Sequence, residues 1–190
     1  LGCIEQRGWT ADTDVIFTTD HGELQGDYGL LFKGPYHCDA LMQLPLIWRP
    51  APSANVSPAR VSAPVGHVDL AQTFCRIAGL DEPAWVEGQA LPVSDDDAWA
   101  QRRQRVLTEW DSQHGPVDMH IRTIYRDGYL CSAYEKSSLY EGTEGELYDL
   151  SSDPNARVNL WTDPMRHNLR TDLVADLYDS LPPRRLPRLE

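Results

Sequence analysis

The sequence lacks three features that would each indicate a class of protein. No apolar run approaches the roughly 20 residues that span a bilayer. Lys and Arg number only 17 against 29 Asp and Glu. The resulting net charge of −12 argues against a nucleic-acid partner and against anionic membrane surfaces, which both need basic residues. The four cysteines lie far apart without a CxxC pair, which argues against a zinc site or a dense disulfide framework and favours reduced thiols.

The remaining composition is that of an ordinary globular protein, with 41% hydrophobic and 24% charged residues. A chain of 190 residues is long enough to bury the core of one domain, or of one domain and part of a second. Alternation of apolar and polar residues begins near residue 103. We therefore expect residues 1–102 and residues 103–190 to form two parts of different architecture.

The most informative segment is residues 15–35, where a short β-branched run ends at Asp20 and His21. Neighbouring strand residues point to opposite faces, so the two can share one ion only where the backbone turns, as Gly22 would allow. Carboxylate oxygen suits Ca²⁺, Mg²⁺ or Mn²⁺, while imidazole shifts the preference toward Mn²⁺ or Zn²⁺. The pair therefore indicates half of a divalent metal site.

Lys33 follows in a glycine-rich loop that also contains Gly26, Gly29 and Gly34. Its ammonium group could hold a phosphate or sulfate oxygen as a point charge. On chemistry alone, a second interpretation stays open, in which Asp20 caps a helix and Lys33 is a solvated surface residue.

Several segments in a fixed order resemble the sulfatase family of the alkaline phosphatase superfamily, which includes phosphonate monoester hydrolases. The resemblance covers roughly residues 14–160. Its segments are residues 18–23 (TTDHGE), 26–30 (GDYGL), 33–35 (KGP), 44–47 (LPLI), 67–73 (HVDLAQT), 78–80 (AGL) and 145–150 (GELYDL), then 153–154 (DP) and 159–160 (NL).

The resemblance implies a fold class and a site. The expected fold is α/β: the C-terminal part of an alkaline-phosphatase-like α/β sandwich, followed by a small antiparallel sheet with a packed helix. Asp20 and His21 match metal-binding positions, and Lys33 matches a lysine that contacts the sulfate or phosphate group. His37 lies four residues further on and could hydrogen-bond the leaving group or the anion. Glu23 could orient His21, as metal-bound imidazoles require.

Complete members of the family attack the ester with a formylglycine made from a Cys/Ser-x-Pro/Ala-x-Arg motif, which this sequence does not contain. We therefore expect the C-terminal part of a metal-dependent hydrolase of sulfate, phosphate or phosphonate esters, inactive by itself. Its partners would be a small-molecule ester and the missing N-terminal half, and a homo-oligomer is also open. The alternative is a truncated, non-catalytic homologue that acts as a binding module.

Patterns along the chain predict the secondary structure. Strands are expected at residues 14–19, 46–48, 106–110, 119–125, 129–134 and 146–150, with a hairpin turn at 126–128. Helices are expected at residues 38–43, 70–78, from 98 onward, from 153 onward and at 163–181, where Leu169, Leu173, Leu177 and Leu181 repeat every four residues. Residues 182–183 (Pro-Pro) should end the last helix, and the Arg-rich tail beyond is expected to be disordered.

Two other groups of polar residues have both a functional and a structural interpretation. Asp69 beside His67 could suggest a second metal site, but helix capping explains Asp69 better and His67 is expected to be structural. Glu109 and Asp111, with His114 nearby, could line the mouth of an active site, or belong to a polar loop.

Overall fold

The structure is a computed structural model that describes residues 1–181, apart from the side chain of Trp99. The expected disordered tail lies outside the described residues. The chain divides into two compact units, which we call unit 1 (Leu1–Gln104) and unit 2 (from Arg105 onward). Within residues 1–181, no helix combines the length and hydrophobicity that crossing a bilayer requires.

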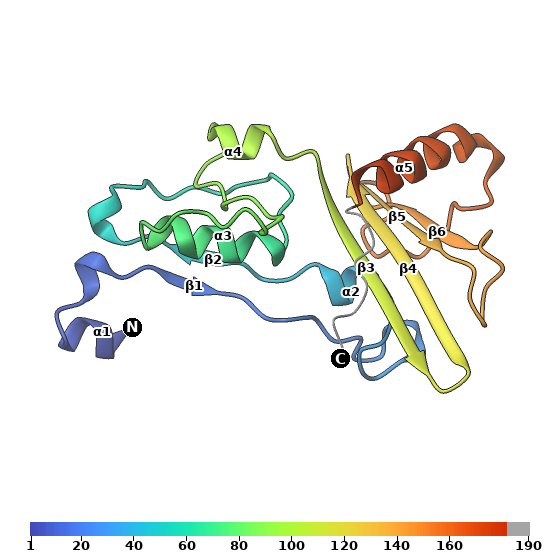
Figure 1. Cartoon of the computed structure of the whole chain (residues 1–190), viewed down its shortest axis with the longest axis horizontal. Helices are drawn as coiled ribbons and strands as arrows, with labels where there is room; N and C mark the ends of the chain where they lie inside the picture. The colour runs from blue at the N-terminus through green and yellow to red at the C-terminus, as the bar shows by residue number, and fades with distance from the viewer. Residues whose placement is uncertain (182–190) are drawn as a thin grey trace. The chain divides into compact units, whose positions relative to one another are not determined.

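Unit 1 consists of short elements joined by long loops (Figure 1). Its elements are α1 (Gly2–Gln6), η1 (Thr10–Asp12), β1 (Val15–Phe17), η2 (Asp27–Gly29), α2 (Asp39–Met42), β2 (Ile47–Arg49), η3 (Pro52–Ala54), α3 (Val68–Ile77) and α4 (Ala98–Gln101). The predicted strands and the helices near residues 38, 70 and 98 are therefore present. β1 pairs with β2 in antiparallel fashion, and its residues are half-buried or exposed.

Helix α3 shows why periodicity alone overestimates burial. It ends as predicted, because Gly79 adopts a left-handed φ of 65° that other residues rarely adopt. The spacing of Thr73, Phe74 and Ile77 places them on one face of the helix, but only Thr73 is buried, and Phe74 and Ile77 are exposed. Among the side chains that the structure describes in unit 1, Leu24, Cys38 and Leu41 form a buried apolar cluster.

Unit 2 is an antiparallel meander covered by a helix (Figure 1). Its sheet runs in the order β3 (Arg105–His114), β4 (Val117–Arg126), β5 (Tyr129–Tyr134) and β6 (Gly145–Asp149). The predicted hairpin turn between β4 and β5 is confirmed, since Asp127 (φ 54°) and Gly128 (φ 81°) both take the positive φ of a type I′ turn.

Helix α5 (His167–Ser180) follows the short helix η4 (Pro164–Arg166) and packs on one face of this sheet. Leu173 and Leu177 of the predicted stripe are fully buried against Ile124, Cys131 and Leu147 of the strands. Together with Ala133, these five side chains form the largest buried apolar cluster of the described residues.

The helix predicted from residue 153 onward is wrong. The residues there form turns, in which the Asp153 carboxylate accepts hydrogen bonds from the N–H groups of Arg157 and Val158. Ala156 takes a positive φ of 49°, which a helix does not allow. The carboxylate therefore binds backbone donors in a loop instead of starting a helix.

Candidate functional site

The candidate ligands lie in the loop that follows β1. His21 Nδ1 is 2.7 Å from the carbonyl oxygen of Gly22, and His21 Nε2 is 2.8 Å from Lys33 Nζ. A lysine ammonium can only donate, so Nε2 must accept, and the imidazole proton resides on Nδ1, where it is donated to Gly22. His21 Nε2 also lies 3.4 Å from Asp20 Oδ2. The loop therefore brings a carboxylate, an imidazole lone pair and an ammonium group together.

The orientation of His21 comes from Gly22 rather than from Glu23. The Glu23 carboxylate lies 4.0 Å from Nδ1, beyond hydrogen-bond distance, whereas the Gly22 carbonyl accepts directly. This arrangement matches a common feature of metal-binding imidazoles, which donate their second ring N–H to a carbonyl or carboxylate.

Gly22 is required for a reason that the sequence did not reveal. Its φ is not positive, but a Cβ atom there would lie 1.9 Å from the carbonyl oxygen of Ala40. Its N–H donates to the carbonyl of Leu41 at 3.0 Å. The chain after Asp20 and His21 is therefore held directly against α2 by backbone contact.

The loop that carries Lys33 is anchored at one end and exposed at the other. Leu24 is buried with Cys38 and Leu41. Beyond it, Gly26 (φ 111°) and Gly29 (φ 73°) turn the backbone sharply. Lys33 is exposed at the far side of this loop, so its ammonium group is accessible to an anion from solvent.

Asp20 and His37 differ in solvent access. The side chain of Asp20 is 84% exposed, and hydrogen bonds from the backbone N–H groups of Asp20 itself and of His21 lower the pKa of Asp20. An ionised, exposed carboxylate can serve as a cation ligand. His37 is only 5% exposed, and its role at the site stays a prediction.

Comparison with known proteins decides the family. A model of the C-terminal region of N-sulphoglucosamine sulphohydrolase matches residues 26–181. The chain belongs to the sulfatase family. It is 32% identical over 176 residues to an uncharacterized sulfatase of Escherichia coli K12, a match that covers 92% of this chain and 33% of that protein. It is 28% identical over 175 residues to a Δ4,5-hexuronate-2-O-sulfatase of Bacteroides thetaiotaomicron, covering 88% of this chain and 34% of that protein.

The fold of this sulfatase-family chain is also found in solved structures. The crystal structure of the phosphonate monoester hydrolase of Agrobacterium radiobacter matches with a TM-score of 0.77 at 21% identity, covering 94% of this chain and 36% of that one. This likeness confirms the predicted fold class. The chain spans about a third of the length of the relatives that it matches.

The structure assigns Asp69 of the sulfatase-family chain a role that sequence reasoning missed. Asp69 is not the N-cap residue of α3. That position is His67, whose side chain makes no capping hydrogen bond. Its buried carboxylate accepts from the N–H groups of Gly66 and Gln89 and from Arg103 Nη1 at 2.6 Å. The signal available was a single acidic residue in the first turn of a predicted helix, which does not identify a partner 34 positions away.

Glu109 and Asp111, the acidic residues of the second polar group, form ion pairs within unit 2. Glu109 and Asp111 lie on β3 opposite Arg122 and His120 of β4. Arg122 Nη2 is 2.9 Å from Asp111, and its Nε is 3.4 Å from Glu109. These carboxylates therefore neutralise a buried guanidinium group within the sheet. The residues lie in strand β3, not in the polar loop that was one of the two interpretations.

No three His, Cys, Asp or Glu side chains within residues 1–181 are grouped closely enough to hold a metal ion. Asp20 and His21 have the chemistry of cation ligands, because an ionised carboxylate and an oriented imidazole lone pair both bind cations.

Proposed function

We propose that this chain is the C-terminal part of a metal-dependent sulfatase that hydrolyses sulfate esters. The observation that carries the proposal is the geometry of His21, whose Nδ1 donates to Gly22 while its Nε2 lone pair faces Asp20 and Lys33. Residues 1–102 would be the end of the catalytic domain, and residues 103–190 the small C-terminal sheet and helix. Membership in the sulfatase family supports sulfate as the transferred group.

Asp20 and His21 would hold a divalent cation, for which Ca²⁺, Mg²⁺, Mn²⁺ and Zn²⁺ are the candidates. The cation would polarise the sulfuryl group and stabilise the nucleophile when bound. Asp20 would contribute a charged oxygen and His21 would contribute Nε2, while the proton stays on Nδ1, hydrogen-bonded to the Gly22 carbonyl. The remaining ligands and the formylglycine would come from the part of the sulfatase polypeptide that precedes this chain.

Lys33 would bind an oxygen of the sulfate ester. Its ammonium group lies 2.8 Å from His21 Nε2, so an anion held beside His21 is within its reach. When Nε2 serves as a ligand, Lys33 is free to donate to the ester oxygen instead. A fixed positive charge there stabilises negative charge that persists or grows in the transition state. His37 would support the leaving group through a change in side-chain position, since it is buried as it stands.

The test compares Lys33→Ala with Lys136→Ala in the complete sulfatase polypeptide, with 4-nitrophenyl sulfate as the substrate. We expect Lys33→Ala to lower kcat/KM by about 100-fold or more with the melting temperature unchanged, as removal of an oxyanion-stabilising donor does. Lys136→Ala should leave turnover unchanged. Near-normal turnover by Lys33→Ala would remove Lys33 from the site.

Metal binding gives a readout that does not depend on turnover. Asp20→Asn and His21→Ala should each lower the bound metal, measured by elemental analysis after dialysis, while Lys33→Ala should not. If all three variants retain full metal content, the cation is held elsewhere in the protein.

A non-catalytic binding module is the second candidate. It is favoured by the absence of the nucleophile motif from this sequence and by the incomplete ligand set in residues 1–181. If the 190-residue chain alone is monodisperse and melts cooperatively in both units, this candidate gains support. Aggregation, or a requirement for a second polypeptide, would favour the sulfatase part.

A further inference from the structure

An exposed aromatic ring lies close to Lys33 along the loop between η2 and α2. Tyr36 follows Lys33 by three residues and is 42% exposed. Its ring rests on the backbone of Gly34, because a Cβ atom built there would lie 2.9 Å from Cε2 and 3.0 Å from Cδ2 of the ring. Cβ atoms essentially never approach other atoms within 3.0 Å. The absence of a side chain at Gly34 is therefore what allows the ring to lie against the backbone one residue after Lys33.

The segment around Tyr36 is held on both sides. Pro35 fixes its own φ at about −65°. His37 and Cys38, the next two residues, are each only 5% exposed, so the chain is anchored directly after the ring. A tyrosine side chain has few rotatable angles, and holding it in one position costs little conformational entropy. The ring is therefore positioned before any ligand binds.

Lys33 and Tyr36 offer a charged contact and an apolar contact in one short segment. The ammonium group of Lys33 is exposed and lies 2.8 Å from His21 Nε2. Three residues of extended chain span at most about 11 Å, so the two Cα atoms lie within that distance. A sulfate ester carries its charge at one end and its organic group at the other. An ester whose sulfate binds Lys33 can therefore place its organic group against the Tyr36 ring.

An aromatic ring selects its ligand by shape. It packs favourably against another ring and against apolar surface, and a broader apolar face covers more of it. A six-membered ring, aryl or saturated, presents such a face, whereas a short acyclic group covers only part of the tyrosine ring. We propose that Tyr36 is a specificity-determining residue that packs against the ring bearing the sulfate group, so that cyclic sulfate esters are preferred to acyclic ones. This inference rests on the proposed function, because it assumes that the protein hydrolyses sulfate esters beside Lys33.

The test measures kcat/KM of the complete sulfatase polypeptide for three sulfate esters. 4-Nitrophenyl sulfate carries an aryl ring and cyclohexyl sulfate a saturated ring, while isopropyl sulfate has the same secondary ester oxygen as cyclohexyl sulfate without a ring. Tyr36→Ala should lower kcat/KM for both ring esters by about 10-fold, the lower end of what an apolar pocket contact contributes. The change should lie mainly in KM, because the lost contact is made in the ground state and the transition state alike. Isopropyl sulfate should change by less than about 2-fold, because it has little contact to lose.

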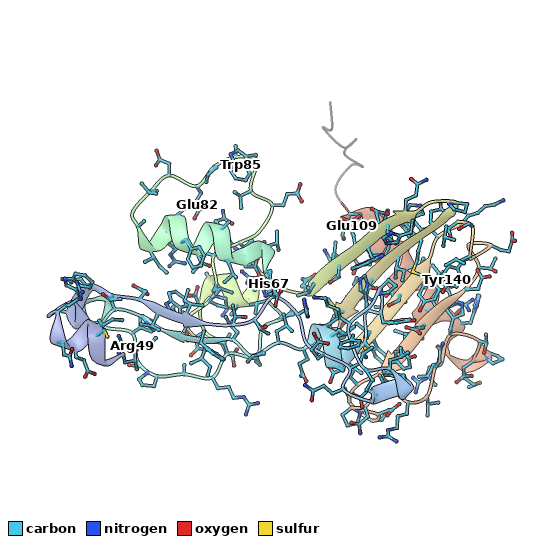
Figure 2. All side chains as sticks on the ribbon, turned by 90° about the horizontal axis from the view of Figure 1, so that it is seen from below. Arg49, His67, Glu82, Trp85, Glu109 and Tyr140 are labelled. Atoms are coloured by element: carbon cyan, nitrogen blue, oxygen red, sulfur yellow. The ribbon has the colours of Figure 1, made fainter. Side chains whose placement is uncertain are left out.

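Two controls separate recognition of the ring from other effects of the substitution. Trp85→Ala removes an exposed aromatic side chain from the loop that follows α3 (Figure 2), and it should leave all three values unchanged. Tyr36→Phe keeps the ring without the hydroxyl group, and it should retain the preference for ring esters. The melting temperature of each variant is measured in parallel, so that turnover is compared only where the protein is folded.

Gly34→Ala tests the position of the ring without removing it. The added methyl group would meet the ring at 2.9 Å and displace it. We therefore expect a selective loss for ring esters, in the same direction as for Tyr36→Ala. In the Tyr36→Ala background the same methyl group meets no ring, and it should have no further effect on the preference.

Each outcome either supports or overturns the role of Tyr36. A loss confined to one of the two ring esters supports it and identifies the kind of ring. An equal loss for all three esters, which a structural role would produce, or no loss for either ring ester, would overturn it. Failure of the proposed function is a separate result, in which Lys33→Ala leaves all three values unchanged whatever Tyr36→Ala does.

Discussion

Breaking the buried ion pair between Asp69 and Arg103 should strongly destabilise unit 1. Both side chains are only 6% exposed, and their charged atoms lie 2.6 Å apart. Arg103 also donates from Nη2 to the carbonyl oxygens of Gln89 and Ala90. The pair thus connects the first turn of α3, the loop at residues 88–91 and the end of unit 1.

The expected loss in the free energy of unfolding depends on which buried charge each variant leaves without a partner. Arg103→Met leaves the Asp69 carboxylate buried with two N–H donors but no cation, and breaking such a pair costs about 3–5 kcal/mol. Two surviving charge-assisted hydrogen bonds place the expected loss near the lower end, at about 3 kcal/mol. The double variant Asp69→Asn/Arg103→Met should cost less than the sum of its parts, because neither charge then remains unpaired.

The assay is urea unfolding of the full chain, followed by far-UV circular dichroism and by hydrogen exchange of peptides from α3. Exposed Arg60→Met is the control for removing a positive charge and should change the free energy of unfolding by less than about 0.5 kcal/mol. The reasoning is refuted if Arg103→Met costs less than about 1 kcal/mol, or if the single and double variants are additive.

Three further predictions concern single positions. Gly22→Ala should destabilise unit 1 by about 2–3 kcal/mol in urea unfolding, because its methyl group meets the Ala40 carbonyl; a neutral effect would show that α2 shifts freely. Burial raises the pKa of the Cys131 thiol to about 12, so iodoacetamide at pH 8 should modify it only after unfolding, as mass spectrometry would show. Burial would raise the pKa of Asp176, but the hydrogen bond from Arg126 lowers it overall. Its stabilisation is therefore full above the unfolded value of 3.8 and lost as pH falls through the lower folded pKa, so Asp176→Asn should destabilise at pH 7 and hardly at pH 2.

Unit 2 could be predicted from the sequence largely because its signals are local. The hairpin turn depends on two adjacent residues, Asp127 and Gly128, whose positive φ angles are a property of those residue types. The leucine stripe of α5 depends on a spacing of four, which places Leu173 and Leu177 on one face whatever the helix packs against. The same local logic failed at Asp153, because a carboxylate can start a helix or close a loop with equal local chemistry.

Sequence reasoning named the members of the candidate site in unit 1 but not the contacts that position them. The order Asp20, His21 and Lys33 suggested a shared anion and metal site, and the structure places His21 and Lys33 in contact. The carbonyl that orients His21 and the close packing of Gly22 on Ala40 depend on chain segments that meet only after folding. No local pattern encodes such a meeting, and the same holds for Asp69 and Arg103, which are 34 residues apart.

The two units differ in how far their apolar side chains are buried, and this difference bears on the candidate site. Unit 2 buries Ile124, Leu147 and the stripe of α5 within itself, whereas unit 1 buries a cluster of three side chains and exposes Phe17 and Ile47 next to the strand that leads to Asp20. Under the proposed function, Asp20 and His21 of the same unit would hold a cation, and its remaining ligands would come from another part of the sulfatase. Cation binding and folding of unit 1 should therefore be coupled, since a ligand that binds only the assembled state stabilises that state by mass action.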